Sequence, residues 1–141
     1  MTTMALTQEE FLAALRQWLG EFPSGVLTLV ERKLPHCVEL KVTPRREDAA
    51  NLTLEVMPYG KFDFYCGRGF MLEGLELDID NCLELVEAVR NGRLREKLWI
   101  VRGRARQNVS TLATKRETYV VRGTSSLLAW LATPVERQYA P

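Results

Sequence analysis

Residues 51–66 read NLTLEVMPYGKFDFYC, and this stretch decides the fold class. Apolar residues alternate with polar ones at Leu52, Leu54 and Val56, and again at Phe62 and Phe64. Successive side chains of a strand point to opposite faces, so each run predicts a strand with one buried face. Between them MPYG places proline second and glycine fourth, as a tight turn requires. We therefore predict an antiparallel hairpin.

Further strands are predicted on both sides of the hairpin. Residues 36–42 show the same alternation. Residues 25–35 are ambiguous, because Val26, Leu29 and Val30 suit a helix face, but the run is β-branched and short enough for a strand, which we favour. Downstream, residues 75–80 alternate again, and two more strands fit residues 98–106 and 115–122. The carboxylates that would share the polar face of the strand over residues 75–80 are Glu76, Asp78 and Asp80.

Three segments have the spacing of amphipathic helices. Residues 8–19 follow a capping box formed by Thr7 and Glu10. A second helix follows Asp80 as its N-cap and ends near Gly92, and a short third helix follows Thr124 or Ser125. We expect residues 1–6 and 134–141 to be flexible. The inward residues of the second helix would be Cys82, Leu85, Val86 and Val89.

The predicted order of elements is helix, three or four strands, helix, two strands, helix. The connections are too short for parallel crossovers, so we predict one α+β domain, residues 1–141, in which an antiparallel sheet of about five to six strands packs against two to three helices. This order is similar to that of small dimeric secretion chaperones and of some bacterial immunity proteins. The resemblance implies a bacterial adaptor that binds another protein.

Composition narrows the function classes. Hydrophobic residues make up 46% of the chain and charged residues 26%, which is typical of a globular protein. The net charge of +1 supplies no global field toward nucleic acid or an anionic membrane. The first residues lack the features of a leader, and no window approaches the roughly 18 apolar residues of a membrane helix. We expect a cytoplasmic protein with no membrane partner.

Side chains that could carry catalysis or bind a metal are sparse. Cys37, Cys66 and Cys82 have neither CxxC nor CxH spacing. The only histidine, His36, neighbours Cys37 in a predicted strand, where the two side chains point apart. We therefore favour a role without catalytic residues, metal or cofactor.

Charge is strongly segregated along the second half of the chain. Residues 70–89 contain six acids and no base, whereas residues 90–122 contain ten bases and two acids. In a strand over residues 98–106, three arginines would stand on one face as a ladder. We predict a partner-binding surface made of this ladder and two further cations, namely Arg102, Arg104, Arg106, Lys115 and Arg116.

Three interpretations of the ladder stay open at this point. It could pair within the molecule with Glu76, Asp78 and Asp80, because opposite charges on adjacent strand faces attract. It could dock an acidic protein partner, since arginine serves well as an interface anchor. Alternatively, it could bind the phosphates of nucleic acid. We favour a non-enzymatic protein-binding module and rank nucleic acid second.

A small-ligand site or an enzyme of unknown class is a third alternative. Such a site would be built around Phe62, Tyr65 and Arg68, and it requires that Arg68 converge with some of the carboxylates at positions 76, 78 and 80. Antiparallel sheets also leave edges to cover, so we expect a homodimer.

Overall fold

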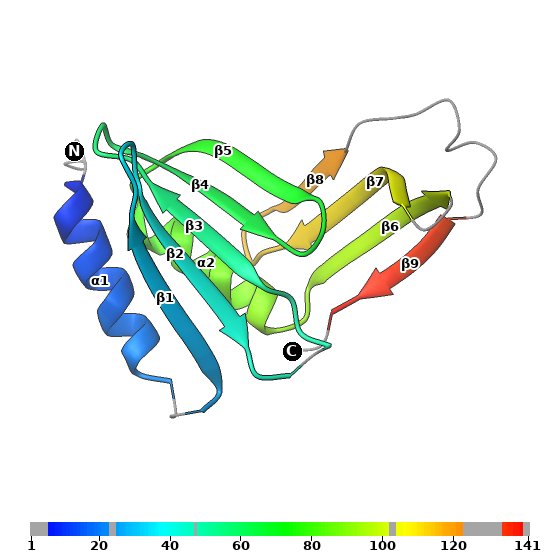
Figure 1. Cartoon of the computed structure of the whole chain (residues 1–141), viewed down its shortest axis with the longest axis horizontal. Helices are drawn as coiled ribbons and strands as arrows, with labels where there is room; N and C mark the ends of the chain where they lie inside the picture. The colour runs from blue at the N-terminus through cyan, green and yellow to red at the C-terminus, as the bar shows by residue number, and fades with distance from the viewer. Residues whose placement is uncertain (1–5, 23–24, 47, 102–103, 123–133, 140–141) are drawn as a thin grey trace.

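Two antiparallel sheets and two helices make up the described part of the chain in the computed structural model (Figure 1). The structure describes residues 6–22, 25–46, 48–101, 104–122 and 134–139. In chain order the elements are α1 (Gln8–Gly20), β1 (Leu27–Lys33), β2 (Val38–Pro44), β3 (Leu52–Val56), β4 (Lys61–Cys66), β5 (Phe70–Glu76), α2 (Ile79–Arg90), β6 (Leu94–Val101), β7 (Arg104–Ala113), β8 (Thr118–Arg122) and β9 (Pro134–Gln138). The α+β class with antiparallel sheets is thus confirmed.

The first sheet is a five-stranded meander in the order β1-β2-β3-β4-β5. Its centre is the predicted hairpin, in which Leu54 pairs with Phe64 and Val56 with Phe62. Gly60 completes the turn at a φ of 85°, a conformation that glycine adopts without a steric penalty. The alternating residues of β3 and β4 are buried on one face, which confirms the expected pleat.

Both helices pack on the buried face of the first sheet. The α1 helix begins at Thr7, whose hydroxyl accepts a 3.2 Å hydrogen bond from the Glu10 amide, as the capping box predicts. The rings of Phe11 and Phe62 lie 5.3 Å apart, and Figure 1 shows α2 behind the sheet. The four predicted inward residues of α2 are all buried. Within the described residues, no helix combines the length and apolar character needed to cross a membrane.

The second sheet has the order β8-β7-β6-β9 and lies beyond β5 in Figure 1. Its side chains Leu94, Leu112 and Tyr139 join the same hydrophobic core as α1, α2 and the first sheet. We had expected one sheet, and this expectation was wrong. The residues after α2 do not extend the meander, because they pair among themselves.

A buried carboxylate connects the two sheets. Glu96 on β6 is 1% exposed, and its two oxygens accept four hydrogen bonds from groups that lie far apart in the sequence. The donors are the Arg68 amide at 2.8 Å, the Gly69 amide at 2.9 Å, the Ser110 hydroxyl at 2.8 Å and the Tyr139 hydroxyl at 2.6 Å. Because a buried charge is costly without such donors, the turn between β4 and β5 and the strand β6 are tied to one another.

The strand predicted over residues 75–80 is displaced. The β5 strand instead ends at Glu76, and Asp78 is the N-cap of α2, since its carboxylate accepts from the amides of Asp80 at 3.0 Å and Asn81 at 3.3 Å. The prediction that Asp80 is the cap was therefore wrong by two residues. The three carboxylates do not share a strand face, because a cap and a helical turn replace the expected alternation.

The strand predicted over residues 98–106 is also wrong, because two strands occupy this stretch. The β6 strand ends at Val101, which pairs with Arg104 at the start of β7. A loose tail was expected after residue 133, but Pro134–Gln138 forms β9 along β6. The predicted third helix after Ser125 lies outside the described residues.

Candidate functional site

Three carboxylates form a row across the centre of the first sheet. Glu39 on β2 is the Cα partner of Glu55 on β3, and Glu55 is the partner of Asp63 on β4. Directly opposite residues of neighbouring strands have Cβ atoms about 4.5–5.5 Å apart. We call these three residues the carboxylate row. They lie on the sheet face opposite the buried Leu54, which we call the open face.

The first member of the row has no good hydrogen-bond partner. Glu39 is 9% exposed, and its Oε1 atom is buried without a hydrogen bond from the described residues. The cations nearest to Oε1 are Arg32 at 3.9 Å and Lys41 at 3.8 Å, both longer than a hydrogen bond. A buried acceptor in this condition is destabilising, so Glu39 is a group that an added donor would stabilise.

Glu55, within the row, and its neighbour Tyr65 both have raised pKa values. Burial raises the pKa of Glu55, and the charges of Asp63 and Glu39 raise it further. Burial also raises the pKa of Tyr65, again with help from Asp63 and Glu55, and the Tyr65 hydroxyl donates to Asp63 Oδ2 at 3.3 Å. Asp63 Oδ1 accepts from the Gly74 amide at 2.8 Å. Negative charge therefore accumulates around Glu55 and Asp63, whereas Glu39 has Arg32 and Lys41 within ion-pair distance.

Apolar side chains flank the row on the same face. Val30 lies opposite Lys41 and is 46% exposed, while Met71 lies opposite Tyr65 and is 44% exposed. Neither helix covers this face, and Lys41 is also exposed. Single exposed apolar side chains are ordinary on a protein surface, so the carboxylate row is the feature that distinguishes this face.

The row does not make a metal centre in the structure. Within the described ranges, no three His, Cys, Asp or Glu side chains are arranged to hold a metal ion. Cys37 is half-buried near the row, and burial followed by the charges of Glu55, Glu39 and Asp63 raises the pKa of its thiol. Cys37 is thus a protonated thiol at neutral pH, and a protonated thiol is a poor nucleophile.

The other two cysteines are buried in the core. Cys66 and Cys82 are 3% and 0% exposed, and burial is the main cause that raises the pKa of each thiol. They pack as small apolar side chains in the core.

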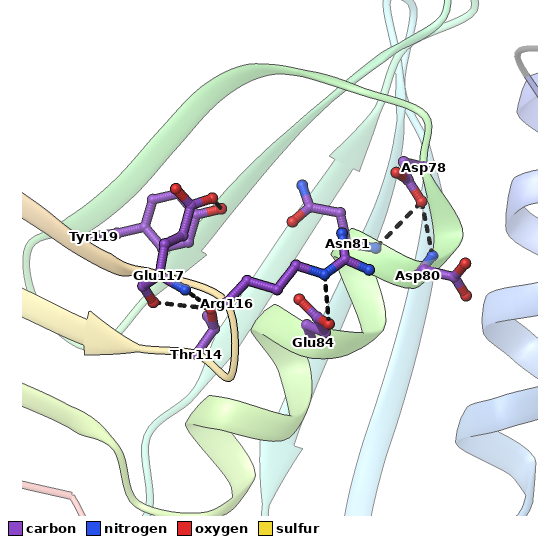
Figure 2. Close-up of polar contacts among 8 residues, drawn as sticks. All are labelled: Asp78, Asp80, Asn81, Glu84, Thr114, Arg116, Glu117 and Tyr119. Carbon is purple, nitrogen blue, oxygen red and sulfur yellow. Dashed lines mark hydrogen bonds and ion pairs between the residues drawn. The ribbon is translucent and has the colours of Figure 1, made fainter. Parts of the chain in front are cut away.

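The acidic helix and part of the basic segment meet within the molecule. Figure 2 shows Arg116, in the turn between β7 and β8, reaching to α2, where its Nε lies 3.0 Å from Glu84 Oε1. The turn is fixed locally, because the Glu117 amide donates to the Thr114 hydroxyl at 3.1 Å. This ion pair leaves untested the pairing expected of Arg102, Arg104 and Arg106 with the acids at positions 76, 78 and 80, because the side chains of the three arginines lie outside the described residues.

The other predicted partner-binding residues are placed only in part. Lys115 is exposed beside Arg116. Arg104 and Arg106 belong to β7, but their side chains fall outside the described part of the structure, as does all of Arg102. Their role in binding a partner stays a prediction. The ladder was based on a single strand over residues 98–106, and that strand is not present.

The alternative ligand site around Arg68 is not brought together. Arg68 precedes β5, whereas Glu76 ends it and forms an ion pair with Lys61. Phe62 is fully buried against α1. Asp78 and Asp80 lie in the cap and first turn of α2, so these groups do not converge on one concave site.

Sequence reasoning missed the carboxylate row, although part of it had a signal. Once the hairpin is centred on its turn, Glu55 and Asp63 must lie opposite each other on the polar face. Glu39 could not be added, because the loop before β3 does not define the register of β2.

Searches against protein-family models, curated proteins and solved structures found no match to this chain.

Proposed function

We propose that this protein is a non-enzymatic module that binds another protein through its open face. The observation that carries the proposal is the carboxylate row, in which Glu39, Glu55 and Asp63 lie side by side on three neighbouring strands. The chemistry of the row selects a partner that presents lysine or arginine side chains. An immunity or chaperone-like adaptor in the cytoplasm is the concrete form of this proposal.

The energetics of the row support a cationic partner. Each pair of like charges directly opposite on a sheet destabilises the free protein, with cross-strand pairs contributing roughly 0.2–1 kcal/mol. A guanidinium or ammonium placed over Glu55 would remove the repulsion and donate hydrogen bonds to unsatisfied oxygens such as Glu39 Oε1. Val30 and Met71 would add apolar contact on either side.

The partner proposed here is cationic, whereas the partner expected from the basic segment was acidic. The basic segment was expected to dock an acidic protein, but Arg116 is already paired with Glu84. Lys115 and the arginines of β7 stay a second predicted surface. Nucleic acid is disfavoured at the open face, because the row would repel phosphate groups.

The proposal is tested by charge reversal at the centre of the row. Tagged wild-type protein captures its partner from cells that naturally produce it, and the purified partner is then titrated calorimetrically with Glu55→Lys. We expect at least tenfold weaker binding, because like charges meet across the interface. In wild type, affinity should also fall as salt is added.

The matched control is Glu136→Lys, an equal change of charge at an exposed site on β9. It should leave the affinity within about twofold of wild type. Equal losses in both variants, or no loss in Glu55→Lys, would refute the open face as the binding surface. Circular dichroism establishes that each variant is folded.

A further inference from the structure

An apolar pocket opens at the end of the core, between the two helices and the first sheet. It has a volume of about 600 Å³, within the range of small-ligand sites. Leu19 and Phe22 line it from the α1 side, Val89 from α2, and Val42 and Leu52 from the sheet. Several of these are core residues, so the pocket is a continuation of the core that the described residues do not fill.

Apolar surface stays exposed at the mouth of this pocket. Val26 lines it and is 47% exposed, and Phe22 and Leu27 are only half-buried. Covering such surface stabilises by roughly 25 cal/mol per Å² removed from water. The pocket therefore favours an occupant with an apolar body.

Three arginines also line the pocket, and none of the described residues that line it is an acid. The Arg90 guanidinium lies 4.6 Å from the centre of the Phe22 ring, which holds it at the rim. Arg45 Nη1 lies 3.0 Å from the position that a Cβ on residue 25 would occupy. Residue 25 is a glycine, and its lack of a side chain leaves room for the Arg45 guanidinium. Arg46 is the third arginine.

The charges on these arginines are only partly neutralised. Arg90 pairs with Glu87 at 3.3 Å and Arg46 with Asp48 at 3.2 Å, both at exposed positions. No carboxylate of the described residues forms an ion pair with Arg45. Both helices end beside the pocket, and each C-terminus adds only about half a negative charge. Arg45 is therefore the guanidinium at the mouth that is left to bind an acid group, and the two helix ends together offset about one positive charge.

We propose that this pocket, which we call the arginine pocket, binds a small amphipathic anion. The ligand has an alkyl or ring body that lies against Leu19, Val42 and Val89, and one acid group that Arg45 and its neighbours bind at the mouth. The inference is independent of the open face, because the two surfaces share no residue.

The test uses decanoate as the probe, below the concentration at which it forms micelles, with binding followed by NMR. Saturable shifts are expected for Leu19, Val26 and Val89. Decyltrimethylammonium has a tail of equal length with the opposite charge, and butanoate has the same acid group with a short tail. Both should bind at least tenfold more weakly. Equal binding of either compound, or no saturable binding of decanoate, overturns the proposal.

Two variants locate the site. Val26→Glu places a competing carboxylate at the mouth, and it should weaken decanoate binding about tenfold. Its matched control is Val30→Glu, because Val30 is 46% exposed but lies on the open face. Arg45→Ala should weaken binding about three- to tenfold, while Arg122→Ala, at an exposed position of β8, should not. Unchanged affinity in Val26→Glu and Arg45→Ala would overturn the proposal.

Discussion

Two glutamates show how the sheet sets the ionisation of single residues in opposite directions. Glu31 on β1 accepts from Arg16 Nε at 3.0 Å, and this contact lowers the pKa of Glu31. Glu55 lies between two carboxylates, where burial and then their charges raise its pKa. The ionised form is thus stabilising at Glu31 and destabilising at Glu55.

We predict that Glu55→Gln stabilises the protein at pH 7 by roughly 0.2–1 kcal/mol, because it removes two like-charge contacts. A raised folded-state pKa means that ionisation opposes folding, so wild type recovers this stability as pH falls through the pKa of Glu55. The difference between variant and wild type should therefore shrink toward acid pH. Urea unfolding at a series of pH values measures it.

Glu31→Gln is the matched control with the opposite sign. In wild type the pKa of Glu31 is lowered in the folded state. Its ionised form therefore contributes stability that is present above the unfolded-state pKa and is lost as pH falls through the folded-state pKa. The variant should be less stable than wild type at pH 7 by less than about 1 kcal/mol, since the pair is exposed. If both variants shift stability in the same direction, the carboxylate row is not electrostatically strained.

At the scale of elements, the turn between β4 and β5 depends on the absence of a side chain. Gly67 has a φ of 61°, and a Cβ there would lie 2.5 Å from Glu96 Oε1 and 2.8 Å from Leu94 Cδ2. The same turn delivers the Arg68 and Gly69 amides to Glu96. Close approach of the turn backbone to two side chains of β6 is thus a condition for burying the carboxylate.

We predict that Gly67→Ala destabilises by about 2–4 kcal/mol, from backbone strain and from displacement of Glu96. Gly60→Ala is the comparison, because Gly60 has a φ of 85° but no atom within 4 Å of its Cβ position. It should cost only about 1 kcal/mol. Urea unfolding distinguishes the two, and equal costs would mean that the contact with Glu96 adds nothing.

Elements with a local signal were predictable from the sequence. The hairpin at Gly60 and the helix after Thr7 follow from alternation and capping, which involve residues close in the chain. The boundary at Asp78 was missed because alternation and a helix cap compete there, and only the cap accepts amide hydrogen bonds.

Features built from distant segments could not be predicted. The strands predicted over residues 98–106 and 115–122 left out Leu94 and Leu112, and an alternating pattern does not show which sheet a strand joins. The donors to Glu96 come from 28 residues earlier and 43 residues later, so no short window contains the centre. The arginine pocket likewise needs the ends of both helices to be placed first.

At the scale of the whole molecule, the β1 edge is the place where we expect self-association. Its first residue, Leu27, is half-buried and the six that follow are exposed. It is the terminal strand of the first sheet. Exposed edges pair readily with other strands, and a two-fold contact would cover the edges of two copies at once.

We therefore expect a homodimer formed by antiparallel pairing of β1 with its copy. Sedimentation at micromolar concentration should show a dimer, and Val30→Lys should favour the monomer by placing like charges across the two-fold axis. Lys41→Glu changes charge on the neighbouring strand and is the control. A monomeric wild type at this concentration would contradict the expectation.

The hydrogen bonds of Glu96 have a consequence for how the molecule comes apart. If the second sheet left the first, the carboxylate would lose the Arg68 and Gly69 amides; if β9 frayed, it would lose the Tyr139 hydroxyl. Either partial opening would exchange donors that the folded chain holds at 2.6–2.9 Å for water, and would give up the hydrogen bonds of the closed site. Stable half-open species are thereby penalised, and the two sheets should melt together in a single all-or-none transition.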